Sequence, residues 1–170
     1  MSATIAQVVD SKDWMSADLH VHAVNSSDSA VLNAVRAANF LAEGVDVLLS
    51  TDHDVITDFA PTVKAIGAEN FIATMIGEET TTFSHGHYNN YPVTRDPNLP
   101  YGGAFDHAGG EDKPTYRVTE LIPEIKKKFP GAVTQLNHPR GGGGVISLLR
   151  VDTATLATHA DPADFNMAPA

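Results

Sequence analysis

The chain has 170 residues, a formal net charge of −10 and no cysteine. This length predicts a single domain, residues 1–170, with a hydrophobic core. The negative charge argues against nucleic acid or an anionic membrane as partner. The lack of cysteine excludes a disulfide framework, a thiolate metal cage and a Cys nucleophile. Residues 1–13 lack the features of a signal peptide, and no apolar run approaches the length of a membrane span. We therefore expect a soluble, cytoplasmic protein.

Apolar segments and turn signals predict strands that alternate with helices. The expected strands cover residues 14–21, 45–50, 71–76 and 132–136, with an edge strand at 5–9. The expected helices cover 29–43, 61–66 and 118–129, with a weak helix at 145–158. We also expect a hairpin over residues 80–83 and 87–93 and a long loop over 94–114. This order predicts an α/β fold with mainly parallel strands and right-handed crossovers.

The first strand ends in Asp18-Leu19-His20-Val21-His22. Side chains alternate along a strand, so His20 and His22 face one side and Val21 faces the other. Two imidazoles that converge on one point suit a metal ion, because His is the commonest metal ligand. Two histidines can also lie near each other by chance in a short chain.

Three later strand ends carry further potential ligands. His53 follows the second strand, Glu79 the third and His138 the last, and His87 lies in the hairpin. In parallel α/β folds, functional residues collect at the carboxyl ends of the strands. The repeated placement of His and carboxylate at these ends predicts a metal site.

Histidine and carboxylate ligands suit Zn, Mn, Fe or Co. Such ions lower the pKa of water and neutralise charge on a phosphoryl or carbonyl oxygen. Asp52 and Asp54 are candidates for orienting imidazole rings. Arg140, in a glycine-rich turn after His138, is a candidate for binding an anionic substrate oxygen.

Five ordered motifs carry a resemblance to a known family. They are Asp18-Leu19-His20-Val21-His22, Ser50-Thr51-Asp52-His53-Asp54, Gly77-Glu78-Glu79-Thr80, Gly86-His87-Tyr88-Asn89 and Asn137-His138-Pro139-Arg140. Together they resemble the polymerase and histidinol phosphatase (PHP) superfamily, most closely its CehA/McbA-type metallohydrolase branch. The resemblance implies a distorted (β/α)7 barrel, TIM-barrel-like in outline, with a two- or three-metal site. It also implies hydrolysis of phosphoesters, although some relatives are associated with esters or carbamates.

The resemblance assigns ligands position by position. It implies that His20, His22 and Glu79 hold one ion, and that Glu79 bridges to a second ion held by His87 and His138. Asp28 and His53 would belong to a third ion. Glu79 is preferred to Glu78 because the family spacing is Gly-x-Glu.

The chain also departs from the family pattern. The family closes with a late Asp-x-His motif, and none occurs after His138. The resemblance therefore implies a truncated barrel with two firmly bound ions and a weak or absent third. His159 is an alternative source of the missing ligand. Because an incomplete sheet leaves open edges, we expect a homodimer that covers them, with exchange of the C-terminal segment as one route.

The sequence thus predicts a metal-dependent hydrolase that cleaves phosphoester bonds of a small substrate through metal-activated water. We expect Zn, Mn or Fe as the ion, with Asp52 and Arg140 as catalytic residues. Two alternatives stay open. The same site could hydrolyse carboxylic esters or carbamates, or the chain could be a non-catalytic relative that binds a metal or an anion. The sequence does not distinguish mono-, di- and triesters, and it leaves the substrate and the metal unidentified.

Overall fold

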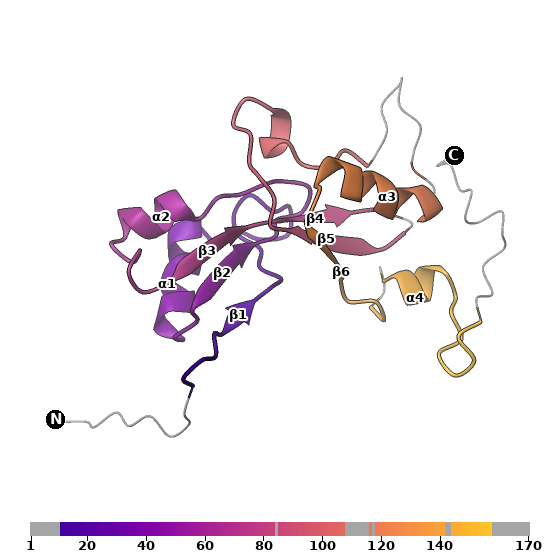
Figure 1. The fold of residues 1–170 in the computed structure, drawn as a ribbon, viewed down its shortest axis with the longest axis horizontal. Helices are drawn as coiled ribbons and strands as arrows, with labels where there is room; N and C mark the ends of the chain where they lie inside the picture. Colours follow the sequence, from indigo (N-terminus) through magenta and orange to yellow (C-terminus); the bar gives the residue numbers. More distant parts are fainter. Residues whose placement is uncertain (1–10, 84, 108–115, 117, 142–143, 158–170) are drawn as a thin grey trace.

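A computed structural model describes residues 11–83, 85–107, 116, 118–141 and 144–157 (Figure 1). Within these residues the strands form two three-stranded sheets, in the orders β1-β2-β3 and β4-β5-β6. The strands are β1 (Ala17–Asp18), β2 (Val47–Ser50), β3 (Ala73–Ile76), β4 (Glu78–Thr81), β5 (His87–Tyr91) and β6 (Val133–Leu136). The helices are α1 (Asn33–Ala42), α2 (Ala60–Ala65), the 3-10 helix η1 (Pro100–Gly102), α3 (Val118–Lys128) and α4 (Val145–Leu148).

The first sheet is parallel, and α1 and α2 lie beside it (Figure 1). All four residues of β2 are buried because this strand is central and is covered by the helices. Ala37 of α1, Leu48 of β2 and Val63 of α2 belong to one hydrophobic cluster. Val21, just beyond β1, joins the same cluster. The side chain of Val21 therefore anchors the segment that carries His20 and His22.

The second sheet is antiparallel and packs against α3 (Figure 1). Tyr88 of β5 lies in a second hydrophobic cluster with Leu121 and Ile125 of α3. The four-residue spacing of Leu121 and Ile125 places them on one face of the helix. Pro123 lies inside α3. The hairpin expected around residues 84–86 is confirmed, since β4 and β5 pair antiparallel with Thr81 opposite His87.

The two sheets meet at Gly77, the one residue between β3 and β4. A Cβ atom on Gly77 would lie 2.8 Å from the carbonyl oxygen of Ser50 and 2.9 Å from that of Asn90. Only glycine allows this approach, because both neighbours are backbone atoms. An isolated parallel bridge between His53 and Glu79 also connects the two halves. The junction brings the end of β2 against the start of β4.

The expected (β/α)7 barrel with mainly parallel strands is wrong for the described residues. Among the described strands, parallel ladders join only β1, β2 and β3, and the other sheet is antiparallel. The parallel bridge between His53 and Glu79 is a single isolated pair. A parallel neighbour requires a crossover connection, usually a helix. Between β3 and β4 the chain has only Gly77, and between β4 and β5 it has a tight hairpin. These short connections direct the chain into a second sheet and do not continue a barrel.

Several elements are shorter than expected. β1 covers two residues instead of eight, because it pairs with β2 alone and only at Ala17 and Asp18. The weak helix at 145–158 is confined to Val145–Leu148. α1 begins at Asn33, later than the expected start at Ser29, and no side chain caps it. The predictions for residues 5–9 and for His159 lie outside the described residues. Over the described part of the chain, no helix is long and apolar enough to cross a bilayer.

Candidate metal centre

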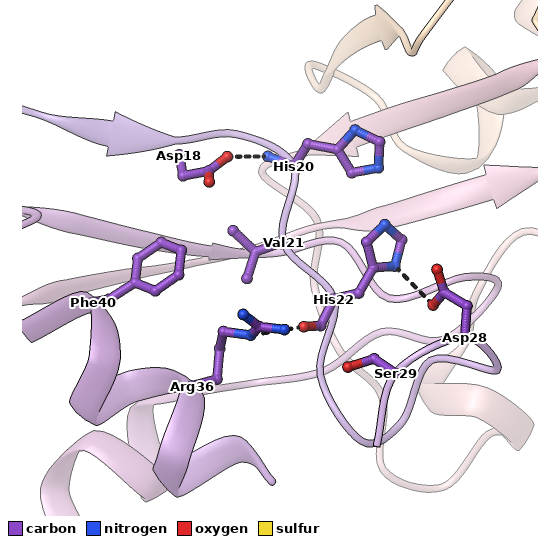
Figure 2. Close-up of a pocket in the computed structure, with 8 residues that line it drawn as sticks. All are labelled: Asp18, His20, Val21, His22, Asp28, Ser29, Arg36 and Phe40. Carbon is purple, nitrogen blue, oxygen red and sulfur yellow. Dashed lines mark hydrogen bonds and ion pairs between the residues drawn. The ribbon is translucent and has the colours of Figure 1, made fainter. Parts of the chain in front are cut away.

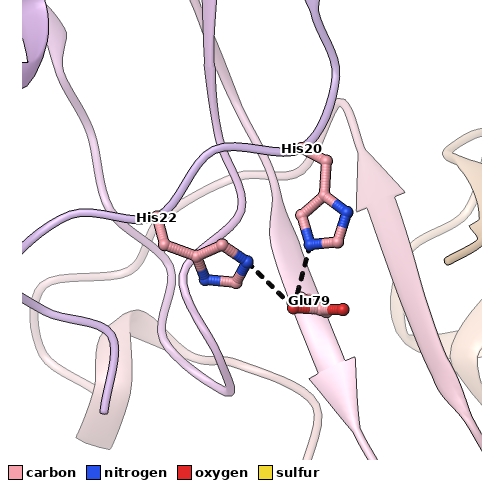
Figure 3. A group of neighbouring side chains, drawn as sticks. All are labelled: His20, His22 and Glu79. Carbon is pink, nitrogen blue, oxygen red and sulfur yellow. Dashed lines mark ion pairs between the residues drawn. The ribbon is translucent and has the colours of Figure 1, made fainter. Parts of the chain in front are cut away.

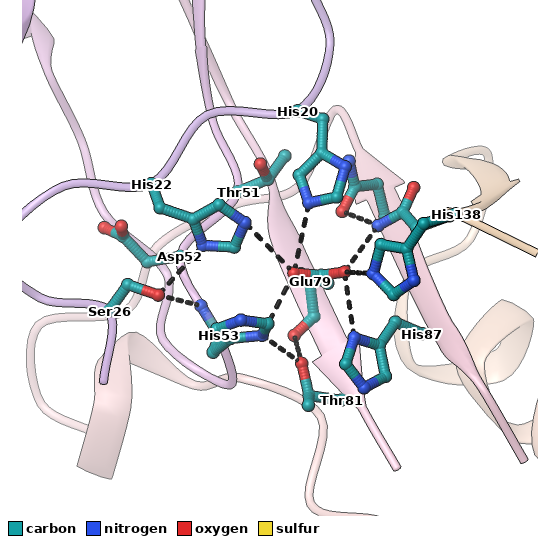
Figure 4. A network of polar contacts seen from close by, with 12 residues as sticks. His20, His22, Ser26, Thr51, Asp52, His53, Glu79, Thr81, His87 and His138 are labelled. Atoms are coloured by element: carbon teal, nitrogen blue, oxygen red, sulfur yellow. Dashed lines mark hydrogen bonds and ion pairs between the residues drawn. The ribbon is translucent and has the colours of Figure 1, made fainter. Parts of the chain in front are cut away.

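Five histidines surround the carboxylate of Glu79, which is fully buried. Its Oε2 atom lies 3.3 Å from His20 Nε2, 3.2 Å from His22 Nε2 and 3.0 Å from His53 Nδ1 (Figures 3 and 4). Its Oε1 atom lies 3.3 Å from both His87 Nδ1 and His138 Nε2. The candidates from the first, second and last strand ends and from the hairpin therefore meet at one carboxylate.

The strands aim these side chains by simple alternation. Val21 is buried in the core, so His20 and His22 on either side of it face away from the core toward Glu79. Glu78 and Glu79 likewise face opposite ways in β4. Glu78 accepts hydrogen bonds from Thr80 Oγ1 at 2.8 Å and from the amide of Phe105 at 2.9 Å. The structure thus places Glu79, and not Glu78, among the histidines.

The separations between these side chains match those of metal ligands. An ion about 2.0–2.1 Å from each ligand in tetrahedral geometry holds the ligand atoms about 3.3 Å apart. The His20 and His22 contacts with Glu79 measure 3.3 and 3.2 Å. Glu79 Oε2 and His87 Nδ1 are also buried without a hydrogen bond. Buried polar atoms rarely lack partners, so these two atoms fit a site that binds a cation.

In the part of the chain that the structure describes, three groups of side chains could each hold an ion, with ligand atoms within 4.8 Å of one another. They are His20-His22-Glu79, His53-Glu79-His87 and His22-Asp28-His53. The first matches the expected first ion. The second takes His53 where we expected His138, and His138 joins none of these groups. The third adds His22 to the expected pair of Asp28 and His53.

At the centre, burial and neighbouring charged groups shift the pKa values of Glu79 and His53 in opposite directions, and the neighbours together have the larger effect. Burial by itself would raise the pKa of Glu79, but contacts with His20, His22 and His53 lower it well below its ordinary value. Burial would lower the pKa of His53, but Glu79 and Asp28 raise it. The pKa of His87 is lowered, chiefly by burial. A carboxylate kept ionised in a buried position is a strong ligand for a cation.

Asparagine side chains fix the central carboxylate from the side of the second sheet. Asn137 Nδ2 donates to Glu79 Oε1 at 2.8 Å and to Asn89 Oδ1 at 2.6 Å. Asn89, which pairs with Glu79 across the hairpin, donates through Nδ2 to the carbonyl oxygen of Leu19 at 2.7 Å. This chain of bonds connects β4, β5 and the end of β6 to the segment that carries His20. It orients the Glu79 carboxylate through Oε1, and Oε2 then faces His20, His22 and His53.

Ser26 connects the loop that carries Asp28 to His22 and His53. Ser26 Oγ lies 2.9 Å from His22 Nδ1 and accepts a hydrogen bond from the amide of His53 at 3.1 Å. A partner at Nδ1 leaves His22 Nε2 free to bind a metal. Asp28 is exposed, 3.7 Å from His22 Nδ1 and 3.5 Å from His53 Nε2. Its carboxylate thus lies at the open rim of the centre.

The predicted catalytic residues lie in different surroundings. Asp52 is fully buried, and its carboxylate accepts hydrogen bonds from the amide of Ala23 at 2.7 Å and from the Thr57 hydroxyl. It therefore fixes the loop that follows His22, and its catalytic role stays a prediction. Asp54 accepts from the amide of Thr81 at 2.9 Å and lies 3.2 Å from His107 Nε2. Arg140 is exposed in the turn after β6, and its role also stays a prediction.

Sequence reasoning assigned no role to Asn89, Asn137 or Ser26. A signal existed for two of them. Asn89 is two residues from His87 on the same strand, so both side chains share a face. Asn137 directly precedes His138 at a strand end. For Ser26 there was none, because its contacts with His22 and His53 depend on the path of an irregular loop.

Comparison with protein-family models, with curated proteins and with solved structures finds no match to this chain. A buried cluster of His and Glu that could hold a metal ion is what the structure establishes.

Proposed function

We propose that this chain is a metal-dependent hydrolase that cleaves phosphoester bonds of a small substrate, and that it is a divergent relative of the PHP superfamily. The observation that carries the proposal is the convergence of five histidines on the buried carboxylate of Glu79, whose Oε2 has no hydrogen bond. Nitrogen and oxygen ligands without sulfur suit Zn, Mn or Fe and do not separate them.

The overlap between the three candidate ligand groups supports binding of two ions by this chain. The groups His20-His22-Glu79 and His53-Glu79-His87 have only Glu79 in common, and a carboxylate has two oxygens. The group that contains Asp28 shares His22 with the first and His53 with the second. A neutral imidazole offers one lone pair, so filling the first two groups leaves Asp28 alone for a third ion. We therefore expect two ions and a weak third.

Bound ions of this kind lower the pKa of water and neutralise charge on a phosphoryl oxygen. The chain's own residues prepare the site for that chemistry. Asn137 fixes the rotation of the Glu79 carboxylate, and Ser26 fixes the ring of His22. Asp28 is exposed at the rim, where a substrate that enters the centre would meet it. Ligands held in fixed positions need little rearrangement during the reaction.

The test compares two adjacent carboxylates. Purified protein, loaded with Zn or Mn, is assayed against a panel of aryl phosphates alongside the variants E79Q and E78Q. We expect turnover in the wild type that chelator abolishes and metal restores, and no turnover in E79Q. E78Q is the matched control, because Glu78 is equally buried but contacts Thr80 and Phe105 instead of the histidines. Full turnover in E79Q would falsify the proposal.

A further inference from the structure

A pocket of about 300 Å³ opens beside the candidate metal centre (Figure 2). His20, His22 and Asp28, which belong to the candidate metal groups, line one part of it. Arg36 and Phe40 of α1 line another part, and their four-residue spacing places them on one face of that helix. The volume is at the lower end of the range for ligand pockets, which suits a small substrate.

Among the described residues, Arg36 is the one Lys or Arg side chain that lines this pocket. Its Nε atom donates a hydrogen bond to the main-chain carbonyl oxygen of His22 at 2.9 Å, as Figure 2 shows. No carboxylate of the described residues lies within ion-pair distance of its guanidinium. The N–H groups on its two outer nitrogens are therefore available. A guanidinium presents these donors in a planar fork that matches the oxygens of a phosphate.

The charge around the pocket makes this cation necessary for an anionic substrate. The chain has a net charge of −10, and Asp18 and Asp28 both line the pocket. An anion that approaches this surface is repelled unless positive groups offset the carboxylates. Bound metal ions would supply one such group, and the guanidinium of Arg36 in the pocket wall would supply another. Its bond to His22 also fixes the guanidinium relative to a metal ligand.

We propose that Arg36 binds an anionic non-bridging oxygen of the substrate, so that the centre takes phosphomonoesters and phosphodiesters in preference to triesters. A triester has no anionic oxygen to pair with the guanidinium. This inference rests on the proposed phosphoesterase function and adds its substrate class. It assigns the anion-binding role to Arg36 on α1, in addition to or in place of Arg140.

The variant R36Q tests the proposal sharply. The Nε2 atom of Gln is as many bonds from Cα as the Nε atom of Arg, so R36Q retains a donor for the His22 carbonyl oxygen. It removes the two outer nitrogens and the charge, and it adds a neutral carbonyl oxygen. R95Q is the matched control, because it also removes one positive charge, and Arg95 lines a different pocket. Metal content is measured on each protein, and binding of inorganic phosphate to the metal-loaded proteins is measured by titration calorimetry.

We expect R36Q to keep its metal and to bind phosphate about 10- to 100-fold more weakly than the wild type, since it loses charge-assisted hydrogen bonds. R95Q should bind phosphate within about twofold of the wild type. Unchanged phosphate binding in R36Q would overturn the proposal. If R140Q then bound phosphate more weakly, the anion-binding role would belong to Arg140. Loss of metal from R36Q would also overturn it, because the outer nitrogens would then support the metal ligands.

Two further readouts keep the test decisive. If R36Q does not fold, phenylglyoxal modification of the wild type replaces it, with modified arginines located by mass spectrometry. Phosphate should protect Arg36 but not Arg95, and an unprotected Arg36 would contradict the proposal.

Kinetics then separates this inference from the proposed function. R36Q should lose kcat/KM for aryl mono- and diesters but not for triesters. An inactive wild type that binds phosphate through Arg36 would refute hydrolysis alone.

Discussion

Asn137 offers a direct measure of how strongly the second sheet supports the metal centre. Its Nδ2 atom donates a 2.8 Å hydrogen bond to Glu79 Oε1, and both side chains are buried. A hydrogen bond to a charged group contributes about 1.5–3 kcal/mol. Substitutions that remove such support from a metal ligand typically weaken metal binding by about 10- to 100-fold. The two figures agree, because every 1.4 kcal/mol is about tenfold.

We therefore expect Asn137→Ala to weaken binding of the first ion by about 10- to 100-fold without changing the number of ligands. The assay is competition between protein and a chelating dye for Zn, with the free energy of unfolding measured in parallel. Asn98→Ala is the control, since Asn98 is exposed and, within the described residues, bonds only to nearby Asp96. An Asn137→Ala protein that binds Zn within twofold of the wild type would refute the reasoning.

Three other predictions follow from the fold and the charges. The contacts that lower the pKa of Glu79 stabilise the metal-free protein above pH 4.5, the ordinary value, and this contribution is lost as the pH falls below it. Urea unfolding of chelator-treated protein should thus show a steeper loss of stability below pH 4.5 in the wild type than in E79Q; parallel curves would contradict this. Gly77→Ala should lower the free energy of unfolding by about 1–3 kcal/mol, because its Cβ would press on two carbonyl oxygens. A thermal melt within 1 °C of the wild type would argue against so tight a junction. We also propose a homodimer, because β1 and β6 each pair on one side within the described residues and Trp14, Met15 and Val133 are exposed. Light scattering at micromolar concentration should give twice the chain mass of 18.1 kDa, and a monomer would count against it.

Local periodicity was enough to predict how the first ligands are arranged. The alternation in His20-Val21-His22 predicts that Val21 faces the core and that the two imidazoles face away from it, and the side chains lie in this way. The hairpin was also predictable from its turn residues, and β4 and β5 confirm it. These features depend on neighbours in sequence, so a single chain contains the information.

The overall architecture depends on contacts between distant residues, and here the sequence was misleading. The barrel expectation came from a resemblance in five short motifs, which name the expected ligands but carry no information on the strand directions. The direct run from β3 through Gly77 into β4, followed by a hairpin, sends the chain into a second, antiparallel sheet. The hydrogen bonds of Asp52 could not be predicted from the sequence either, since Ala23 and Thr57 approach it only in the folded chain. Arg36 was missed because a helical arginine looks like a surface residue until α1 is placed beside His22.

The measurement that tests the central claim most directly is the metal content per chain of purified protein, determined by elemental mass spectrometry. The ligand sharing at Glu79 predicts about two ions per chain in the wild type and a clear loss in E79Q. Less than one ion per chain in the wild type, even after reconstitution with Zn or Mn, would contradict the account.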